Sequence, residues 1–124
     1  MRYLLFTMIA ALCATAGTAQ SMNAEQFHQR ATKLKAKGPL ALFSKGEINA
    51  LMAEGKAAGQ AARAQRLAAV AAGQTPRYCP PGKGSMGSDE FMSRLAGIPQ
   101  AERRQITMTE ATTRIMMRKY PCAK

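Results

Sequence analysis

Apolar positions recur at helical spacing along almost the whole chain after residue 20, and no strand-like alternation lasts more than a few residues. Asn23 is placed to cap a first helix, in which Phe27, Ala31 and Leu34 fall on one apolar stripe. Lysines follow this stripe, where positive charge suits the end of a helix, and the Gly-Pro pair at 38–39 is expected to stop it. The first element is therefore a short amphipathic helix.

A short apolar link, Leu40 to Phe43, leads to a second and much longer helix. Ser44-x-x-Glu47 has the pattern of a capping box, so we expect this helix to begin at Lys45. Its buried face is expected to start with large side chains, continue with small ones and end with large ones; in chain order these are Ile48, Leu51, Met52, Gly55, Ala58, Gly59, Ala62, Leu67 and Val70. The small stripe favours close approach of a neighbouring helix. Each glycine in it weakens the helix by roughly 1 kcal/mol relative to alanine, so a kink or break there is compatible with the sequence.

The segment after the long helix is rich in turn-forming residues. Gly73 to Pro76 is expected to end the helix, and Pro80 to Ser88 contains two prolines and three glycines, which predicts a loop. This loop follows no strand and lacks the lysine spacing of a phosphate-binding loop. Ser88 is then expected to cap a third helix that Pro99 closes. Its inward-facing positions are Phe91, Leu95 and Ile98.

The last helix has the clearest start in the chain. Thr107-x-x-Glu110 is a capping box, and Ile106 is placed to staple over Ala111. Pro121 is expected to end the helix. Its apolar stripe consists of Met108, Ala111, Thr112, Ile115 and Met116. The whole pattern predicts a small all-α domain of four or five helices, without an internal repeat.

Residues 1–19 have the pattern of a cleavable signal peptide. Arg2 supplies the positive charge, Leu4 to Leu12 is an apolar run too short for a stable transmembrane helix, and small residues follow. We place cleavage after Ala19, with Ala16 as the alternative, so that residues 20–124 form one exported domain. An uncut N-terminal anchor is the other interpretation of this segment. Lipidation at Cys13 is disfavoured because the residue before it is a leucine.

Two cysteines remain after the leader, Cys79 and Cys122. An exported chain without another long apolar stretch is expected in an oxidising compartment, most plausibly a bacterial periplasm, where this pair should form a disulfide. Closing a loop of about 44 residues is worth roughly 4 kcal/mol in the chain-entropy model. With His28 as the one histidine, the chain lacks the ligands for a structural zinc site.

The excess of basic residues indicates which kinds of partner the chain could bind. Of 18 lysines and arginines only Arg2 lies in the leader, and all seven acidic residues follow it, so the exported chain carries a net charge of about +10. This charge favours anionic surfaces such as lipid headgroups, acidic glycans or an acidic protein, although a merely solvated basic surface is the plainer interpretation. The basic residues are scattered and are not interleaved with the aromatic residues that nucleic-acid binders use for base stacking, which disfavours nucleic acid.

The sequence contains few residues arranged for catalysis. His28 stands alone, the glutamates are spread over separate helices, and no serine or cysteine has a nucleophile motif. Methionines such as Met108 and Met116 could suggest a copper site, but they have core spacing, and methionine commonly fills gaps in a core. We therefore expect neither an enzyme nor a bound cofactor or metal.

Tyr78-Cys79-Pro80-Pro81 after a long helix, together with Lys119-Tyr120-Pro121-Cys122 at the end, resembles the Rap/Tai family. The resemblance covers mainly Tyr78 to Cys122. It implies a small periplasmic helical protein that binds and blocks a peptidoglycan-cleaving amidase delivered by type VI secretion. It carries no effector-binding residue over to this chain.

The sequence thus predicts an exported, non-enzymatic protein similar to an immunity protein. Because loops on rigid scaffolds often carry function, we expect its partner to contact the loop after the cysteine motif, through Pro80, Pro81, Lys83 and Met86. The alternatives are a basic envelope-associated protein that binds anionic lipid or glycan, and a holdase for unfolded periplasmic proteins.

Overall fold

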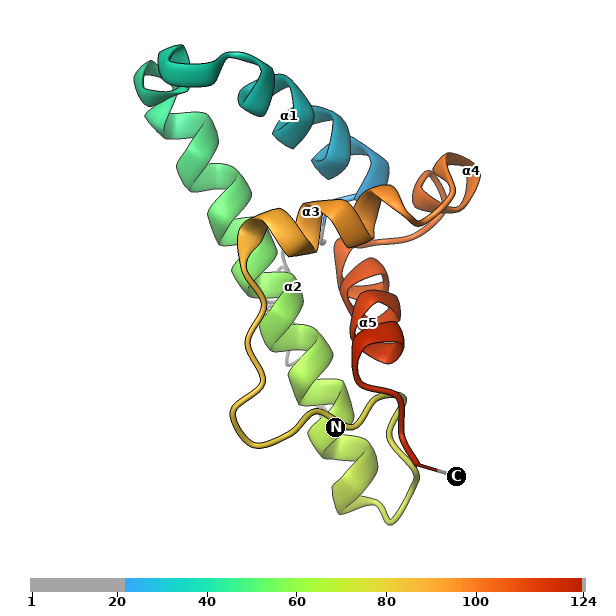
Figure 1. Cartoon of the computed structure of the whole chain (residues 1–124). Helices are drawn as coiled ribbons and strands as arrows, with labels where there is room; N and C mark the ends of the chain where they lie inside the picture. The colour runs from blue at the N-terminus through green and yellow to red at the C-terminus, as the bar shows by residue number, and fades with distance from the viewer. Residues whose placement is uncertain (1–21, 124) are drawn as a thin grey trace, which may run out of the picture.

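The computed structural model describes residues 22–123, which form six helices (Figure 1). They are α1 (Ala24–Ala36), the 3-10 helix η1 (Gly38–Phe43), α2 (Lys45–Ala71), α3 (Ser88–Ala96), α4 (Gln100–Arg103) and α5 (Met108–Lys119). The prediction of an all-α domain is confirmed. The expected signal peptide, its cleavage positions after Ala19 and Ala16, and Cys13 lie outside the described residues.

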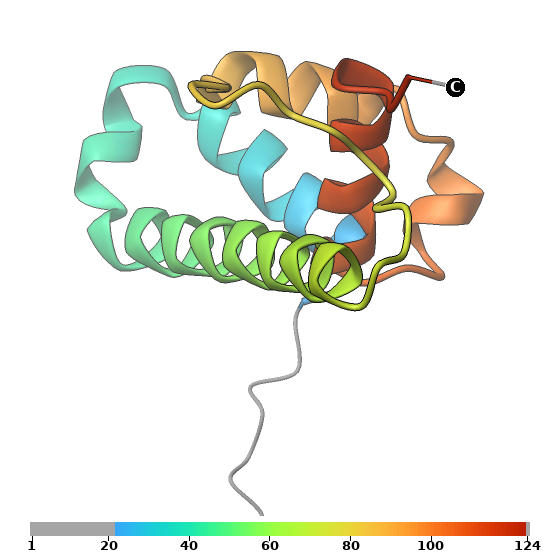
Figure 2. The ribbon, with the colours of Figure 1, turned by 90° about the horizontal axis from the view of Figure 1, so that it is seen from below.

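The long helix α2 forms the spine of the domain. Figure 1 shows α5 beside one half of α2, with α1 and η1 at the other end and α3 lying across the bundle. Seen from below, α2 and α3 run on opposite sides, with α1 between them (Figure 2). The core lies where α1, α3 and α5 meet the middle of α2. Its buried members are Ala24, Phe27, Leu51, Ala58, Leu95, Ile98, Met108, Ala111 and Ile115.

The predicted small-residue face of α2 packs inward. Ala58 and Ala62 are each only 1% exposed, and α2 runs on without a break at either Gly55 or Gly59. Of the large residues expected on this face, Leu51 is buried as predicted, but Met52 is 70% exposed, and Leu67 and Val70 are about half exposed. The prediction that these last three are buried is wrong. At 1.5 Å per residue, α2 is about 40 Å long and α5 about 18 Å, so α2 extends beyond the helix that covers it.

The first residues described join the start of the domain to the start of α5. Asn23 and Thr107 form an isolated antiparallel bridge, in which the Ala24 amide donates to the Ile106 carbonyl at 3.0 Å and the Met108 amide donates to the Met22 carbonyl at 2.8 Å. Each bridge residue also caps the helix that follows it, as predicted. This arrangement places the N-termini of α1 and α5 side by side.

Replacing Thr107 by alanine is expected to lower the free energy of unfolding by about 1 kcal/mol, because the Thr107 hydroxyl accepts the Glu110 amide at 3.1 Å. Ser44→Ala is the matched control and is expected to leave it almost unchanged. Chemical denaturation of the two variants measures both effects. Equal losses would contradict this assignment of the caps.

The predicted capping box at Ser44 is wrong, because the Ser44 side chain makes no capping hydrogen bond to α2. For this reason Ser44→Ala serves as the control. At φ −104° and ψ 43° the Ser44 backbone lies outside the extended region typical of an N-cap, and its hydroxyl instead accepts the Lys37 ammonium at 3.0 Å. Glu47 pairs with Arg30 and not with the Ser44 backbone. Ser88 is likewise the first residue of α3 and not its cap, a position that Gly87 takes.

A buried ion pair ties α4 to α1. The Arg103 Nε donates to Glu25 at 2.7 Å, and both side chains are less than a tenth exposed. The same guanidinium donates to the carbonyls of Ala96 and Ile98 at the end of α3. Burial favours the neutral acid, but the hydrogen bond and charge of Arg103 outweigh it, so the pKa of Glu25 is lowered. The sequence pattern predicted neither α4 nor this pair.

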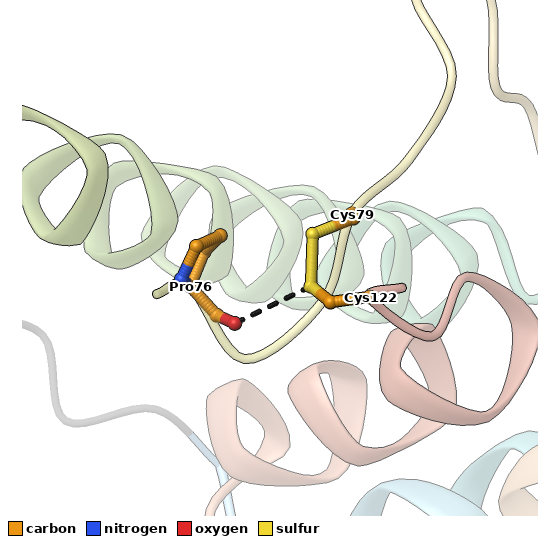
Figure 3. The surroundings of a disulfide bond; sticks show 3 residues. All are labelled: Pro76, Cys79 and Cys122. Carbon is orange, nitrogen blue, oxygen red and sulfur yellow. Dashed lines mark hydrogen bonds between the residues drawn. A yellow bond between two sulfur atoms is a disulfide. The ribbon is translucent and has the colours of Figure 1, made fainter. Parts of the chain in front are cut away.

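The disulfide between Cys79 and Cys122 is present, as expected (Figure 3). The two Cα atoms are 4.8 Å apart, and the Cys79 amide donates to the Tyr120 carbonyl at 2.8 Å. The Cys122 sulfur lies 3.4 Å from the Pro76 carbonyl oxygen. This is a close contact and not a hydrogen bond, because a disulfide sulfur has no hydrogen to donate. The bridge therefore joins the end of α5 to the segment that leaves α2.

An ion pair joins the segment that leaves α2 to the start of α5. Arg77 donates to both carboxylate oxygens of Glu110, at 2.7 and 2.8 Å, and Arg114 donates to one of them at 3.0 Å. The hydrogen bonds from Arg77 are the main reason that the pKa of Glu110 falls to about 2. This carboxylate thus stays ionised, and stays paired, well into the acid range.

Candidate partner-binding groove

The predicted contact loop, Pro80 to Ser88, has no regular structure up to the first residue of α3 and is largely exposed. Both of its halves are tied to the end of α5. The disulfide holds its start, and the Lys119 ammonium donates to the Ser85 carbonyl at 3.1 Å. A Cβ atom at Gly84 would lie 3.1 Å from the Tyr120 hydroxyl, so the loop backbone passes close to that ring. The loop is thus held on the bundle surface.

The four loop residues singled out from the sequence do not form one site. Pro80 and Pro81 line a small pocket between α2 and α5. Met86 lines a larger, apolar groove on the other side of the loop. Lys83 is exposed and lines neither. The loop therefore borders two different cavities, and its second half belongs to the larger one.

The larger cavity is an open groove of about 1030 Å³ between α1, η1, α2 and α3. In Figure 2, α2 and α3 run on opposite sides, α1 lies between them, and η1 connects α1 to α2. Its apolar lining includes Phe27, Leu34, Ile48, Leu51, Met86 and Phe91. Phe27 and Leu51 are also members of the core, and the Phe27 ring meets that of Phe91 edge to face at 6.3 Å between centroids. The groove is thus an opening onto the core itself.

Large apolar side chains stand exposed at the end of the groove formed by η1. Leu40, Leu42 and Phe43 are 66, 71 and 87% exposed, and Met52 on the neighbouring turn of α2 is 70% exposed. Met52 lines the groove, whereas Leu40, Leu42 and Phe43 lie beside it on η1, whose Gly38 and Ala41 form part of the lining. Single exposed apolar residues are ordinary, but four next to an apolar groove suggest a binding surface. We call Leu40, Leu42, Phe43 and Met52 the apolar rim.

Lysines surround this groove. Lys35 and Lys56 line it, and Lys37 and Lys45 are exposed at the two ends of the segment that carries η1. The one acidic residue in the lining, Asp89, lies 4.0 Å from Lys35, and both side chains are almost fully in solvent. Such a pair contributes little, so the mouth of the groove is positively charged.

The one histidine of the chain, His28, also lines the groove. Burial lowers its pKa, and the positive charge of Arg103 acts in the same direction, so the imidazole is neutral at pH 7. Within residues 22–123 no hydrogen bond joins it to another side chain. Over the same residues, no group of three or more His, Cys, Asp or Glu side chains is placed to hold a metal ion.

Comparison with family models, with curated proteins and with solved structures finds no match to this chain. The resemblance to the Rap/Tai family stays a prediction from residues 78–122. Any function is therefore inferred from the groove and its charges. None of the helices described is long and apolar enough to cross a membrane.

Sequence reasoning missed the groove because it treated Leu40 to Phe43 as a link. A signal was present: four apolar residues in a segment of six, between two helices, cannot all reach one core. A positive φ at Gly38 (55°) turns the chain sharply out of α1, and the 3-10 helix then carries these side chains away from the bundle. An apolar run directly after such a turn is a useful sign of a binding surface.

Proposed function

We propose that this chain is an exported, non-enzymatic binding protein whose groove receives an apolar helix of an acidic partner protein. The observation that carries the proposal is the open groove of about 1030 Å³, which is apolar inside, has the exposed Met52 in its wall and lies next to the exposed apolar side chains of η1. An amphipathic helix laid into such a groove would bury Met52 with the lining and would extend over η1. The lysines at the mouth of the groove, on a chain of net charge +11, favour acidic residues on the flanks of that helix.

The finer proposal concerns the partner's identity. The resemblance to the Rap/Tai family suggests a peptidoglycan amidase delivered into the periplasm by type VI secretion, which this chain would bind and block. The expected signal peptide and the disulfide agree with that compartment. Because Met86 borders the groove, the predicted contact loop and the groove would belong to one contact surface.

A second candidate function is attachment to an anionic lipid or glycan of the envelope. It is favoured by the excess of 18 lysines and arginines over seven acidic residues. Binding of this kind collapses as salt rises, because exposed charges are screened over about 8 Å at physiological ionic strength. Binding of an apolar helix in the groove keeps most of its strength. Salt dependence therefore separates the two functions.

Replacing two residues of the rim, Phe43→Ser with Met52→Gln, is expected to weaken partner binding at least about tenfold, because large apolar anchors dominate interface energy. Both side chains are mostly exposed, so the fold should not change. Val70→Ser is the matched control, since Val70 is half exposed near the far end of the same helix, away from Met52 and η1. Circular dichroism and thermal unfolding check that all variants fold.

The measurement has two steps. Oxidised protein is used to retain proteins from an envelope extract at physiological salt, and the retained protein is then purified and titrated by calorimetry. Stoichiometric binding that the rim variant loses and the control keeps supports the proposal. Equal binding by the rim variant, or retention only of lipid or of acidic proteins that salt removes, would count against it.

A further inference from the structure

A second, smaller pocket lies between α2, the start of the loop after it, and α5. Its volume is about 590 Å³, and its lining includes Gly59, Arg63, Arg66, Tyr78, Pro81 and Thr112. It is separate from the apolar groove, with which it shares no lining residue. The two cavities open at successive turns of α2, since Gly55 lines the first and Gly59 the second.

Two polar atoms at this pocket lack the partner that a folded protein normally provides. The Arg66 Nε and the Thr112 hydroxyl are both buried, and neither has a hydrogen-bond partner within residues 22–123. Thr112 as a whole is 7% exposed. Because an unsatisfied buried polar group is costly, such atoms are rare, and each calls for an explanation. A guanidinium can only donate, so the missing partner is an acceptor.

The charge of the pocket is also uncompensated. Arg63 and Arg66 are three residues apart on α2, which places both on one face of the helix. Neither takes part in any ion pair among the described residues. Five other arginines of the domain do: Arg30, Arg77, Arg94, Arg103 and Arg114. Two like charges beside one cavity repel each other, and a bound anion would remove that repulsion.

The arginine closest to the loop is held in place. The Arg66 guanidinium lies over the Tyr78 ring, 5.6 Å from its centroid, and Tyr78 is only 3% exposed. The next residue, Cys79, is fixed by the disulfide and by its backbone bond to Tyr120. A cation–π contact with a buried ring favours one position of the guanidinium before any ligand arrives.

We infer that this pocket is a binding site for an oxyanion, a phosphate or a carboxylate group, held by Arg63 and Arg66. An arginine fork matches the oxygens of either group and can bind them in a bidentate manner. An oxyanion that enters the pocket supplies acceptors where Arg66 Nε lacks one, and Thr112 lies on the opposite wall, on α5. This site does not depend on the function proposed for the apolar groove.

Titration of the oxidised chain with sodium phosphate, followed by ¹⁵N NMR at constant ionic strength, tests the site. Saturable shifts are expected at the Arg66 Nε and at the amides of Tyr78 and Thr112, with sodium acetate acting more weakly and sodium chloride not at all. Arg63→Gln and Arg66→Gln should each weaken phosphate binding about tenfold or more. Arg118→Gln removes the same charge from the exposed end of α5 and should change nothing.

A third variant separates binding from folding. In Thr112→Val the unpaired hydroxyl is replaced by a methyl group, so the melting temperature without phosphate should rise while phosphate affinity falls. A rise in stability without a loss of affinity would remove Thr112 from the site. Shifts that do not saturate, or an equal effect of Arg118→Gln, would overturn the inference, because they would mean general attraction to a basic surface.

A parallel binding experiment with phosphatidylglycerol vesicles distinguishes a soluble oxyanion from a lipid headgroup. Binding to inorganic phosphate but not to vesicles assigns the pocket to a soluble ligand. Vesicle binding that Arg66→Gln abolishes and Arg118→Gln keeps assigns it to a lipid headgroup. Absence of both would overturn the site.

Discussion

Replacing Arg103 by methionine is expected to lower the free energy of unfolding by about 3–5 kcal/mol at pH 7, a large share of the stability of a small domain. The substitution keeps most of the side-chain volume but leaves the Glu25 carboxylate buried without its partner. Only the amides of Gln29 and Gln100 then remain to donate to that carboxylate. The carbonyls of Ala96 and Ile98 lose their donor as well.

The pH dependence follows from the sign of the shift at Glu25. In the native chain the pKa of Glu25 is lowered, so the pair contributes stability above the unfolded pKa and loses it as pH falls through the lower folded value. In Arg103→Met only burial acts strongly, and the pKa of Glu25 should rise. The deficit of the variant should therefore shrink as pH falls and Glu25 takes up a proton.

A double-mutant cycle checks the assignment. Glu25→Gln with Arg103→Met should recover much of the loss, because replacing both partners of a buried pair is far cheaper than removing one. Arg30→Met is the matched control: it breaks a pair with Glu47 of the same length, 2.7 Å, whose side chains are more than a third exposed, and should cost much less. Urea denaturation of the native chain, the two single variants, the double variant and the control at pH 7 and pH 4 measures each free energy of unfolding. Equal losses for Arg30→Met and Arg103→Met would contradict the role of burial.

The elements that could be predicted from the sequence are those with local signals. Asn23 and Thr107 cap their helices, the Gly-Pro pair at 38–39 follows α1, and α2 begins at Lys45 as expected. Each of these features depends on a few adjacent residues. A capping pattern alone was not sufficient at Ser44, where Lys37, seven residues earlier, donates to the hydroxyl.

Features that depend on how far one helix extends past another could not be predicted. Met52 and Val70 have the spacing of a buried face, but which turns of α2 are covered depends on the length and position of α5. The apolar groove has a related origin, because it lies between α1, η1, α2 and α3 where no residue of α5 contributes to the lining. Arg103 is buried through a partner 78 positions away, which no local pattern contains.

The basic pocket combines a feature that the local sequence predicts with one that depends on tertiary packing. The spacing of Arg63 and Arg66 on one helix face can be read from the sequence. Their place beside Tyr78 and Thr112 requires the chain to turn back after α2 and to be held against α5. The Cys79–Cys122 disulfide fixes that return. Removing the bridge should therefore affect a binding site as well as stability.

Replacing both cysteines by serine is expected to lower the free energy of unfolding by about 4 kcal/mol, from the entropy of the loop that the bridge closes. A loss of this size would leave a small domain only marginally stable. Guanidinium denaturation of the oxidised chain, the chain in reductant and the Cys79→Ser/Cys122→Ser variant measures it. Since Cys79 is exposed, reductant should reach the bridge in the folded state.

Two controls define what the bridge does. Reductant should not change the denaturation midpoint of the serine variant, which separates loss of the bridge from other effects of the reagent. Hydrogen exchange should quicken first in Tyr78 to Gly84 and at the end of α5, while the pairing of α1 with α5 through Asn23 and Thr107 persists. An equal increase at all amides would mean that the bridge acts only on the unfolded chain.

The same variant links the fold to the second pocket. While it remains folded, it should bind phosphate more weakly than the oxidised chain, because Tyr78 no longer holds the Arg66 guanidinium in place. Its apolar groove shares no lining residue with that pocket, and its wall of α1 and η1 lies at the far end of the domain, so partner binding there should fall less. Equal losses at both sites would show that the bridge supports the domain as a whole. Loss at the basic pocket alone would show that it positions Tyr78 and Arg66.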